Sequence, residues 1–144
     1  MVLAFQAREA TKDVDAIFEP AAGIRKAAAA VAAQLGLPED WLNDAAKGFL
    51  SSSGDCAPLE ALDLPNLRVM APTLEYMLAM KVIAARAGLG DERGDREDIA
   101  FLIRALGLRR AEDVMAIAQR YYDPSRILPR SHYVVDEILE RENS

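Results

Sequence analysis

Two aspartates near the start of the chain, Asp13 and Asp15, have the spacing that most directly suggests chemistry. They flank Val14, and the apolar side chains of Ala16 and Phe18 continue the alternation. In a β-strand, residues two apart project from the same face. Mg²⁺ takes one or two carboxylates and leaves its other positions to water and phosphate, so such a pair could hold this ion. The same pattern also suits ordinary solvated charges at a strand end.

The residues that precede this pair include Arg8, Thr11 and Lys12. Their hydroxyl and cationic groups could contact an anionic substrate such as a phosphate. The same residue types would also occur in a solvent-exposed segment that leads into a strand. Both interpretations, contact with a substrate and simple exposure to solvent, therefore stay open.

The bulk composition predicts one globular domain that is soluble and cytoplasmic. The 144 residues carry a net charge of −6, and 51% of them are hydrophobic, which suffices for a core. Without a broad basic surface, tight duplex binding is not favoured, whereas binding of a small nucleotide is compatible. The single cysteine, Cys56, excludes an internal disulfide. We find no signal peptide and no apolar run of the ~20 residues that span a membrane.

Helix start and stop signals divide the first half of the chain. Pro20 and Gly36 bound an alanine-rich helix over 21–35. A shorter helix is expected over 38–47, ended by Gly48 and anchored to the core by Trp41. After a polar loop over 51–55, the apolar runs 59–64 and 67–71, broken at Pro65, predict either a hairpin or two extended pieces around a tight turn.

The second half is predicted to be helical, over 72–87, 95–106, 111–122 and 131–141. The first of these segments is apolar on nearly every side and should be buried. Three tyrosines are expected to pack between these helices: Tyr121, Tyr122 and Tyr133.

Lys81 is the only charged residue between Glu75 and Arg86 of the buried segment. It either extends its ammonium to water or lines a pocket, because a buried ammonium without a partner is costly. In the segment that follows, Asp95 would be an N-cap and Asp98 a first-turn acid favoured by the helix dipole.

Taken in order, four segments give the chain a resemblance to a known family. They are 11–15, 38–44, 67–69 leading to 78–81, and 95–99. The resemblance based on their order and spacing runs over nearly all of the chain. The chain resembles the uncharacterised nucleotidyltransferase-like proteins related to the AbiEii-like abortive-infection toxins. The resemblance implies an α+β fold of the polymerase-beta-like type, with a small mixed β-sheet carrying catalytic acids and helices covering it. Residues 1–71 would form this sheet region, and 72–144 a helical region packed on it in the same domain.

The resemblance also implies roles for particular residues. Asp13 and Asp15 would bind Mg²⁺ and the nucleoside triphosphate, with Thr11 and Lys12 beside them. Lys81 would contact phosphate, and Asp95 and Asp98 would lie near the site. The expected reaction transfers a nucleoside monophosphate from a nucleoside triphosphate to an unknown acceptor, such as a protein or tRNA. The resemblance also implies a toxin–antitoxin or phage-defence pair with a cognate antitoxin.

The chain departs from the family pattern at two places. The family has a Gly-Gly or Gly-Ser turn before its paired acids, whereas the first glycine here is Gly23. The family's third carboxylate has its best candidate in Asp63, with Asp55 and Glu60 behind it, although none lies in a clear alternation. We therefore expect weak or no activity.

Two other functions stay open beside nucleotidyl transfer. The chain could be a non-catalytic member of the fold that binds a partner, and an unpaired sheet edge would favour a homodimer. It could also be a helical scaffold in which the acids are merely solvated.

Overall fold

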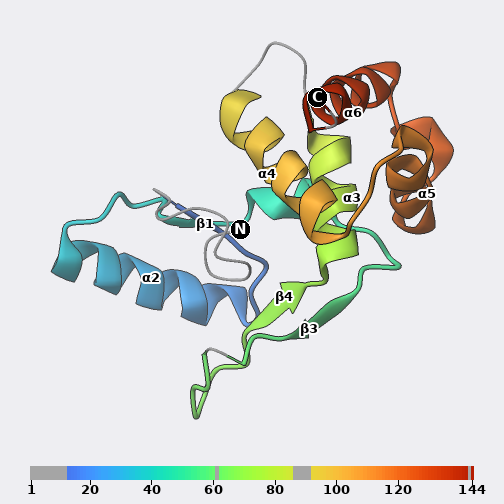
Figure 1. Cartoon of the computed structure of the whole chain (residues 1–144). Coiled ribbons are helices and arrows are strands. Elements are labelled where there is room, and N and C mark those ends of the chain that lie inside the picture. Colours follow the sequence, from blue (N-terminus) through green and yellow to red (C-terminus); the bar gives the residue numbers. More distant parts are fainter. Residues whose placement is uncertain (1–12, 61, 86–91, 143) are drawn as a thin grey trace. The chain divides into compact units, whose positions relative to one another are not determined.

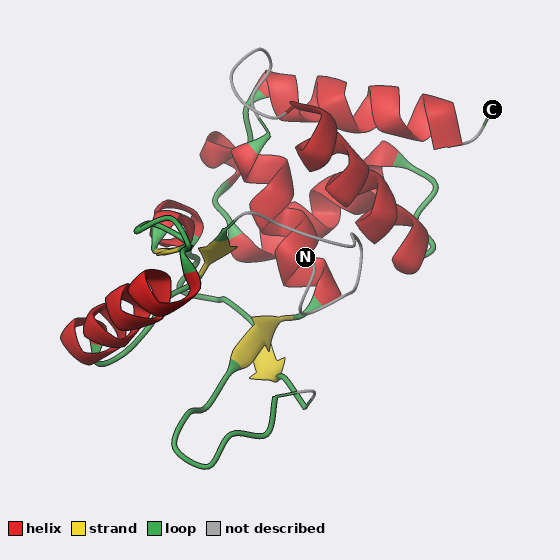
Figure 2. Ribbon diagram, turned by 90° about the vertical axis from the view of Figure 1, so that its left-hand side faces the viewer, coloured by secondary structure: helices red, strands yellow, loops and turns green. Residues whose placement is uncertain are grey.

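The structure is a computed structural model that describes residues 13–60, 62–85, 92–142 and 144 (Figure 1). Helices make up most of this part of the chain, and the strands are short (Figure 2). The α+β class is therefore confirmed. The contacts group the described residues into two compact units, 13–50 and 51–144, which we call the N-terminal and C-terminal units. The expected assignment of 1–71 and 72–144 to a single domain stays a prediction.

The N-terminal unit is a β-α-β arrangement. Strand β1 (Val14–Asp15) pairs in parallel with β2 (Leu42–Asn43), and helix α2 (Ala21–Leu35) connects them. A parallel pair requires such a crossover, because its two strands run in the same direction. The expected helix over 21–35 is confirmed. It ends at Gly36, whose φ of +67° is left-handed and whose N–H donates to the carbonyl of Ala32.

The helix expected over 38–47 is wrong. Val14 N–H donates to the carbonyl of Trp41 and Ala16 N–H donates to that of Asn43, so this segment is drawn into the parallel pair. A 3₁₀-helix, η1 (Ala45–Phe49), follows it. The local signals at Pro38 and Gly48 do suit a helix, but pairing with β1 satisfies the backbone of the segment in another way. The indole of Trp41 donates to the carbonyl of Ala28, 3.0 Å away, and so attaches β2 to α2.

The C-terminal unit begins with the predicted hairpin. Strand β3 (Cys56–Pro58) is antiparallel to β4 (Met70–Pro72), and Cys56 lies opposite Pro72. The paired strands lie further from the turn than expected. Between them, a single bridge joins Leu64 to Leu67 around the predicted turn.

Helices form the rest of this unit: α3 (Leu74–Ala84), α4 (Glu92–Ala105), α5 (Ala111–Tyr121), the 3₁₀-helix η2 (Pro124–Arg126) and α6 (Pro129–Glu142). Helix α3 contacts α4, α5 and α6 (Figure 1). Its fully buried side chains Leu78 and Val82 confirm the predicted buried helix. Among the described residues, none of the helices combines the length and apolarity needed to cross a membrane.

The tyrosines behave differently from one another. Tyr121 packs against Tyr76 with ring centroids 4.9 Å apart, and Tyr122 is buried, as expected. The expectation for Tyr133 is wrong, because 69% of this residue is exposed. It lies on the outer face of the amphipathic helix α6, whose inner face carries Val134, Val135 and Ile138.

Candidate functional site

Asp13 and Asp15 lie on the same side of the extended segment that contains β1. Both are exposed, whereas Val14, Ala16 and Phe18 are half-buried, so the predicted alternation is confirmed. Only Val14 and Asp15 belong to the paired strand, and Asp13 immediately precedes it. The two carboxylates thus project from one exposed face of the N-terminal unit.

The opposite face of this segment is covered by α2. The Arg25 guanidinium lies 5.3 Å from the ring centroid of Phe18 and donates to Asp44 at 2.7 Å. Phe18 is half-buried like Val14, and Asp44 lies between β2 and η1. The hydrogen bond from Lys47 lowers the pKa of Asp44 below its ordinary value against the opposing effect of desolvation, and the positive charges of Lys47 and Arg25 add to the lowering. Asp44 therefore serves to attach α2 rather than to bind metal.

Asn43 lies beside Asp15 in the parallel register. Its side-chain oxygen accepts a hydrogen bond from Ala45 N–H at 3.0 Å, forming an Asx turn at the start of η1. Sequence reasoning missed this neighbour because it placed residue 43 in a helix. No signal in a single sequence fixes the register of a parallel pair, since the two strands are joined by a long crossover.

Lys81, Asp95 and Asp98 are brought together between α3 and α4. The ammonium of Lys81 lies 2.9 Å from a carboxylate oxygen of Asp95 and 2.8 Å from one of Asp98. The side chain of Lys81 is 22% exposed, that of Asp95 46% and that of Asp98 only 1%. Burial favours the neutral amine, but hydrogen bonds to Asp98 and Asp95 outweigh it and raise the pKa of Lys81 above its ordinary value. The lysine is therefore held as a cation.

This cluster corrects the expected capping roles. Helix α4 already includes Glu92, so Asp95 is inside the helix rather than its N-cap, and Asp98 lies beyond the first turn. Residues 95 and 98 are three apart and share a helix face, which places both carboxylates against α3. Lys81 accordingly points to two partners on α4 and does not simply extend into water.

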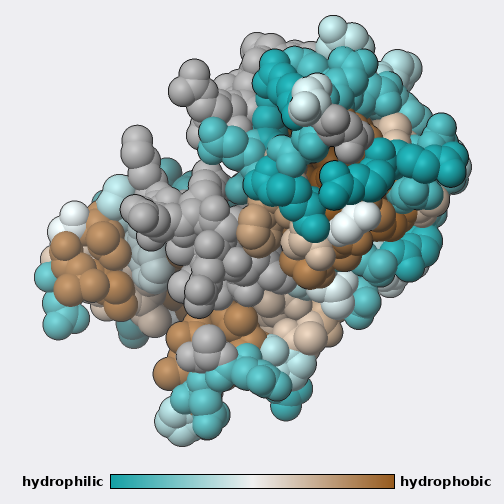
Figure 3. Space-filling view, in the orientation of Figure 1, coloured by the Kyte–Doolittle hydropathy of each residue, from teal (hydrophilic) through white to brown (hydrophobic). Residues whose placement is uncertain are grey.

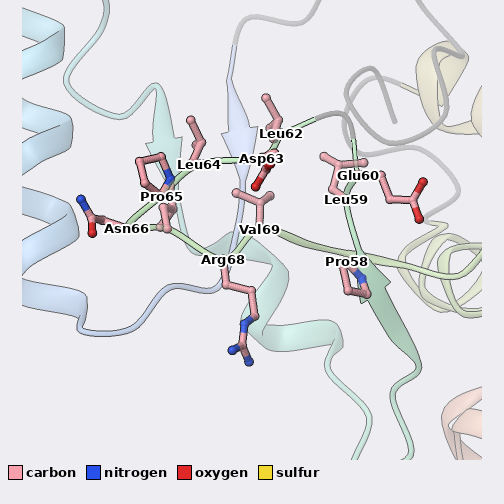
Figure 4. A pocket seen from close by; sticks show the side chains of 11 residues that line it. Pro58, Leu59, Glu60, Leu62, Asp63, Leu64, Pro65, Asn66, Arg68 and Val69 are labelled. Atoms are coloured by element: carbon pink, nitrogen blue, oxygen red, sulfur yellow. The ribbon is translucent and has the colours of Figure 1, made fainter.

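Asp63 lies in the connection between β3 and β4, and it is exposed. It belongs to no strand and therefore lacks the strand position of the third carboxylate in the resembled family. With Glu60 and Arg68, it lines an open hollow formed by this connection (Figure 4). Thr11 and Lys12 lie outside the described residues.

The predicted site residues are thus distributed over both units. Asp13 and Asp15 belong to the N-terminal unit, whereas Asp63 and the Lys81 cluster belong to the C-terminal unit. In the part of the chain that the structure describes, no group of three or more His, Cys, Asp or Glu side chains is placed to hold a metal ion. A metal ion bound by Asp13 and Asp15 would therefore have two carboxylate ligands from the chain and would take its other ligands from substrate and water.

Comparisons with protein-family models, with curated proteins and with solved structures yield no match to this chain.

Proposed function

We propose that the chain binds a Mg²⁺–nucleoside triphosphate through Asp13 and Asp15 and transfers the nucleoside monophosphate to an acceptor hydroxyl. The observation that carries this proposal is the position of the two carboxylates on one exposed face, opposite the face that α2 covers.

The residues present suit the proposed ion. Mg²⁺ prefers oxygen ligands and usually takes few of them from the protein when phosphates are present. When bound, it would offset negative charge on the phosphates during transfer. Asp13 and Asp15 would then fix the triphosphate against the N-terminal unit.

In the transfer, the acceptor oxygen forms a bond to the α-phosphorus while the bond from that phosphorus to the bridging oxygen of pyrophosphate breaks. The proton of the acceptor hydroxyl passes to solvent water, and pyrophosphate leaves. The acceptor hydroxyl of a protein or tRNA stays a prediction. A contact between Lys81 and phosphate also stays a prediction, and it would require the ammonium to exchange a carboxylate partner for a phosphate oxygen.

Calorimetric titration with each of the four ribonucleoside triphosphates in Mg²⁺ tests this proposal. We expect the wild-type chain to bind at least one of them and the double variant Asp13→Ala/Asp15→Ala to lose that binding. The control Glu39→Ala/Asp40→Ala removes the same charge from exposed acids of the same unit and should bind normally. Equal binding by both double variants, or none by the wild type, would reject the proposal.

A dimerising module is the second candidate function. Among the described residues, β1 and β2 pair only with each other, and a two-stranded sheet leaves backbone groups at its edges. Apolar side chains also gather at the C-terminal end of α2, where Leu35 is 66% exposed and Leu37 39% exposed (Figure 3). Such a surface is suited to a second copy of the chain.

Size-exclusion chromatography with light scattering distinguishes this candidate. The wild type should show a dimer that dissociates on dilution, and Leu35→Ser/Leu37→Ser should be monomeric. Tyr133→Ser, which removes an equally exposed apolar group from α6, should leave the dimer intact. A monomeric wild type at all concentrations would exclude this function.

A further inference from the structure

We propose that Asn43 is a further nucleotide-binding residue, whose side-chain amide donates a hydrogen bond to a phosphate oxygen of the nucleotide held at Asp13 and Asp15. This inference rests on the proposed function and extends it by a residue for which the sequence alone predicts no role at the site. It is carried by the register of the parallel pair and by the orientation of the Asn43 amide.

The register places Asn43 next to Asp15. The two are direct partners in the β1–β2 pair, and Ala16 N–H donates to the carbonyl of Asn43 at 2.9 Å. Directly paired residues of neighbouring strands project from the same face, and neighbouring strands lie about 4.8 Å apart. Since Asp13 shares this face by alternation, the three side chains belong to one surface of the N-terminal unit.

The Asx turn fixes the direction of the Asn43 amide. Its oxygen accepts from the backbone N–H of Ala45, and only the oxygen of the amide can accept a hydrogen bond. The NH₂ group is therefore turned away from η1, with two N–H donors. Asn43 is half-buried, so its side chain has limited freedom to turn elsewhere.

A neutral donor suits a position beside two carboxylates. The non-bridging oxygens of a triphosphate are strong acceptors, and a hydrogen bond to a charged group is stronger than one between neutral groups. The amide could contact such an oxygen without competing for the metal, whereas a lysine here would pair with Asp15.

Two substitutions separate the proposed donor from the turn. Asn43→Asp retains an oxygen that accepts from Ala45 N–H, as the Asp123 side chain does from Ser125 N–H, but it has no N–H donors. Asn43→Ser also retains an acceptor oxygen and adds no charge, and its single O–H donor lies on a shorter side chain that does not reach as far as the amide NH₂. Both variants should therefore unfold at a temperature close to that of the wild type.

The test is calorimetric titration of the full chain and both variants with the four Mg²⁺–ribonucleoside triphosphates, together with thermal unfolding followed by circular dichroism. We expect both variants to bind at least about tenfold more weakly than wild type, with unchanged unfolding temperatures. Wild-type affinity in Asn43→Ser would overturn the inference while leaving the proposed function intact. A loss of affinity that only accompanies a lowered unfolding temperature would assign Asn43 to the turn alone and would also overturn it. Absence of binding by the wild type would reject the proposed function and the inference together.

Discussion

At the scale of the residue, Lys81 shows how an ammonium is accommodated near a core. Two carboxylates of α4 lie within 3 Å of it, and one of them, Asp98, is buried. Burying charges is costly, so such a cluster adds little net stability over an apolar replacement. Removing one partner is different, because it leaves the buried carboxylate without its nearest positive charge.

We therefore predict that Lys81→Met lowers the free energy of unfolding by about 3 kcal/mol. Asp95→Asn should cost less than about 1 kcal/mol, because that carboxylate is half-exposed. Urea unfolding followed by circular dichroism measures both.

The double variant Lys81→Met/Asp98→Leu is the informative control. It removes the whole charge pair and fills the space with apolar groups, so it should regain most of the lost stability. If Lys81→Met alone were nearly neutral, the cluster would not be a structural element of the α3–α4 contact.

Cys56 gives a second prediction at this scale. Although Cys56 is exposed, desolvation of the thiol by neighbouring groups, and then the negative charge of Asp55, raise its pKa above the ordinary value. The thiolate is the reactive form, so alkylation by iodoacetamide should be slow at pH 8. The alkylation rate should rise with pH. The pH at which it is half-maximal, the midpoint, should be higher for the folded chain than for the same chain unfolded in 6 M guanidinium chloride. Asp55→Asn should lower the midpoint, and an unchanged midpoint on unfolding would contradict the prediction.

At the scale of the element, α2 shows what local signals can determine. Its two ends follow from Pro20 and from Gly36, and its interior from alanine, the residue with the strongest helix preference. The hairpin and the helices of the C-terminal half could be anticipated in the same way, from turn residues and apolar periodicity.

Elements that depend on distant partners could not be predicted in this way. The stretch at Leu42 and Asn43 has helix signals on both sides, yet it pairs with β1 across the whole of α2. The sequence predicts too late a start for α4, because Asp95 resembles a cap, whereas its carboxylate pairs with Lys81 of α3. The same holds for the candidate site. The common face of Asp13 and Asp15 can be predicted from the alternation of residues along the chain, whereas the position of Asn43 beside them depends on the register of the parallel pair.

The end of α2 provides the prediction at this scale. Gly36 has a φ of +67°, a conformation that a side chain disfavours, so Gly36→Ala should cost about 1 kcal/mol of stability. Gly48→Ala is the matched control, because no such φ is found there and a methyl group would meet no atom within 4 Å.

The fluorescence of Trp41 is the appropriate measurement for this pair. It is the only tryptophan of the chain, and its indole binds α2 directly. Urea unfolding of both variants should show a shifted transition for Gly36→Ala and a nearly unchanged one for Gly48→Ala. Equal shifts would mean that the left-handed end does not limit the stability of α2.

At the scale of the whole molecule, the two units differ in how much apolar surface they bury. The core cluster is drawn entirely from residues 76–139, from all four helices of the C-terminal unit. In the described part of the N-terminal unit, the buried apolar side chains are those of Ala28 and Ala32. Small side chains bury little area, so the N-terminal unit has far less hydrophobic stabilisation of its own.

The loop that begins the C-terminal unit belongs structurally to its helices. Ser51 N–H donates to the Tyr76 hydroxyl at 2.8 Å, and Ser51 Oγ donates to the carbonyl of Tyr121. Gly54 lies so close to the Tyr76 ring that a Cβ there would be 2.8 Å from it. A boundary at residue 51 keeps these contacts, whereas a boundary at residue 72 removes them.

We predict that the fragment 51–144 folds alone, with a cooperative thermal transition within about 5 °C of the helical transition of the full chain. The fragment 72–144 should unfold at a clearly lower temperature, because it exposes Tyr76 and loses its partners at Ser51 and Gly54. The fragment 13–50 should show no cooperative transition. Circular dichroism melts of the three fragments and the full chain measure this order.

If 51–144 were unfolded while the full chain melted in a single transition, the N-terminal unit would be required for the helical core, and the chain would have to be treated as one cooperative domain. If 72–144 were as stable as 51–144, the boundary would lie at residue 72, and the contacts of the 51–55 loop would contribute nothing to the core.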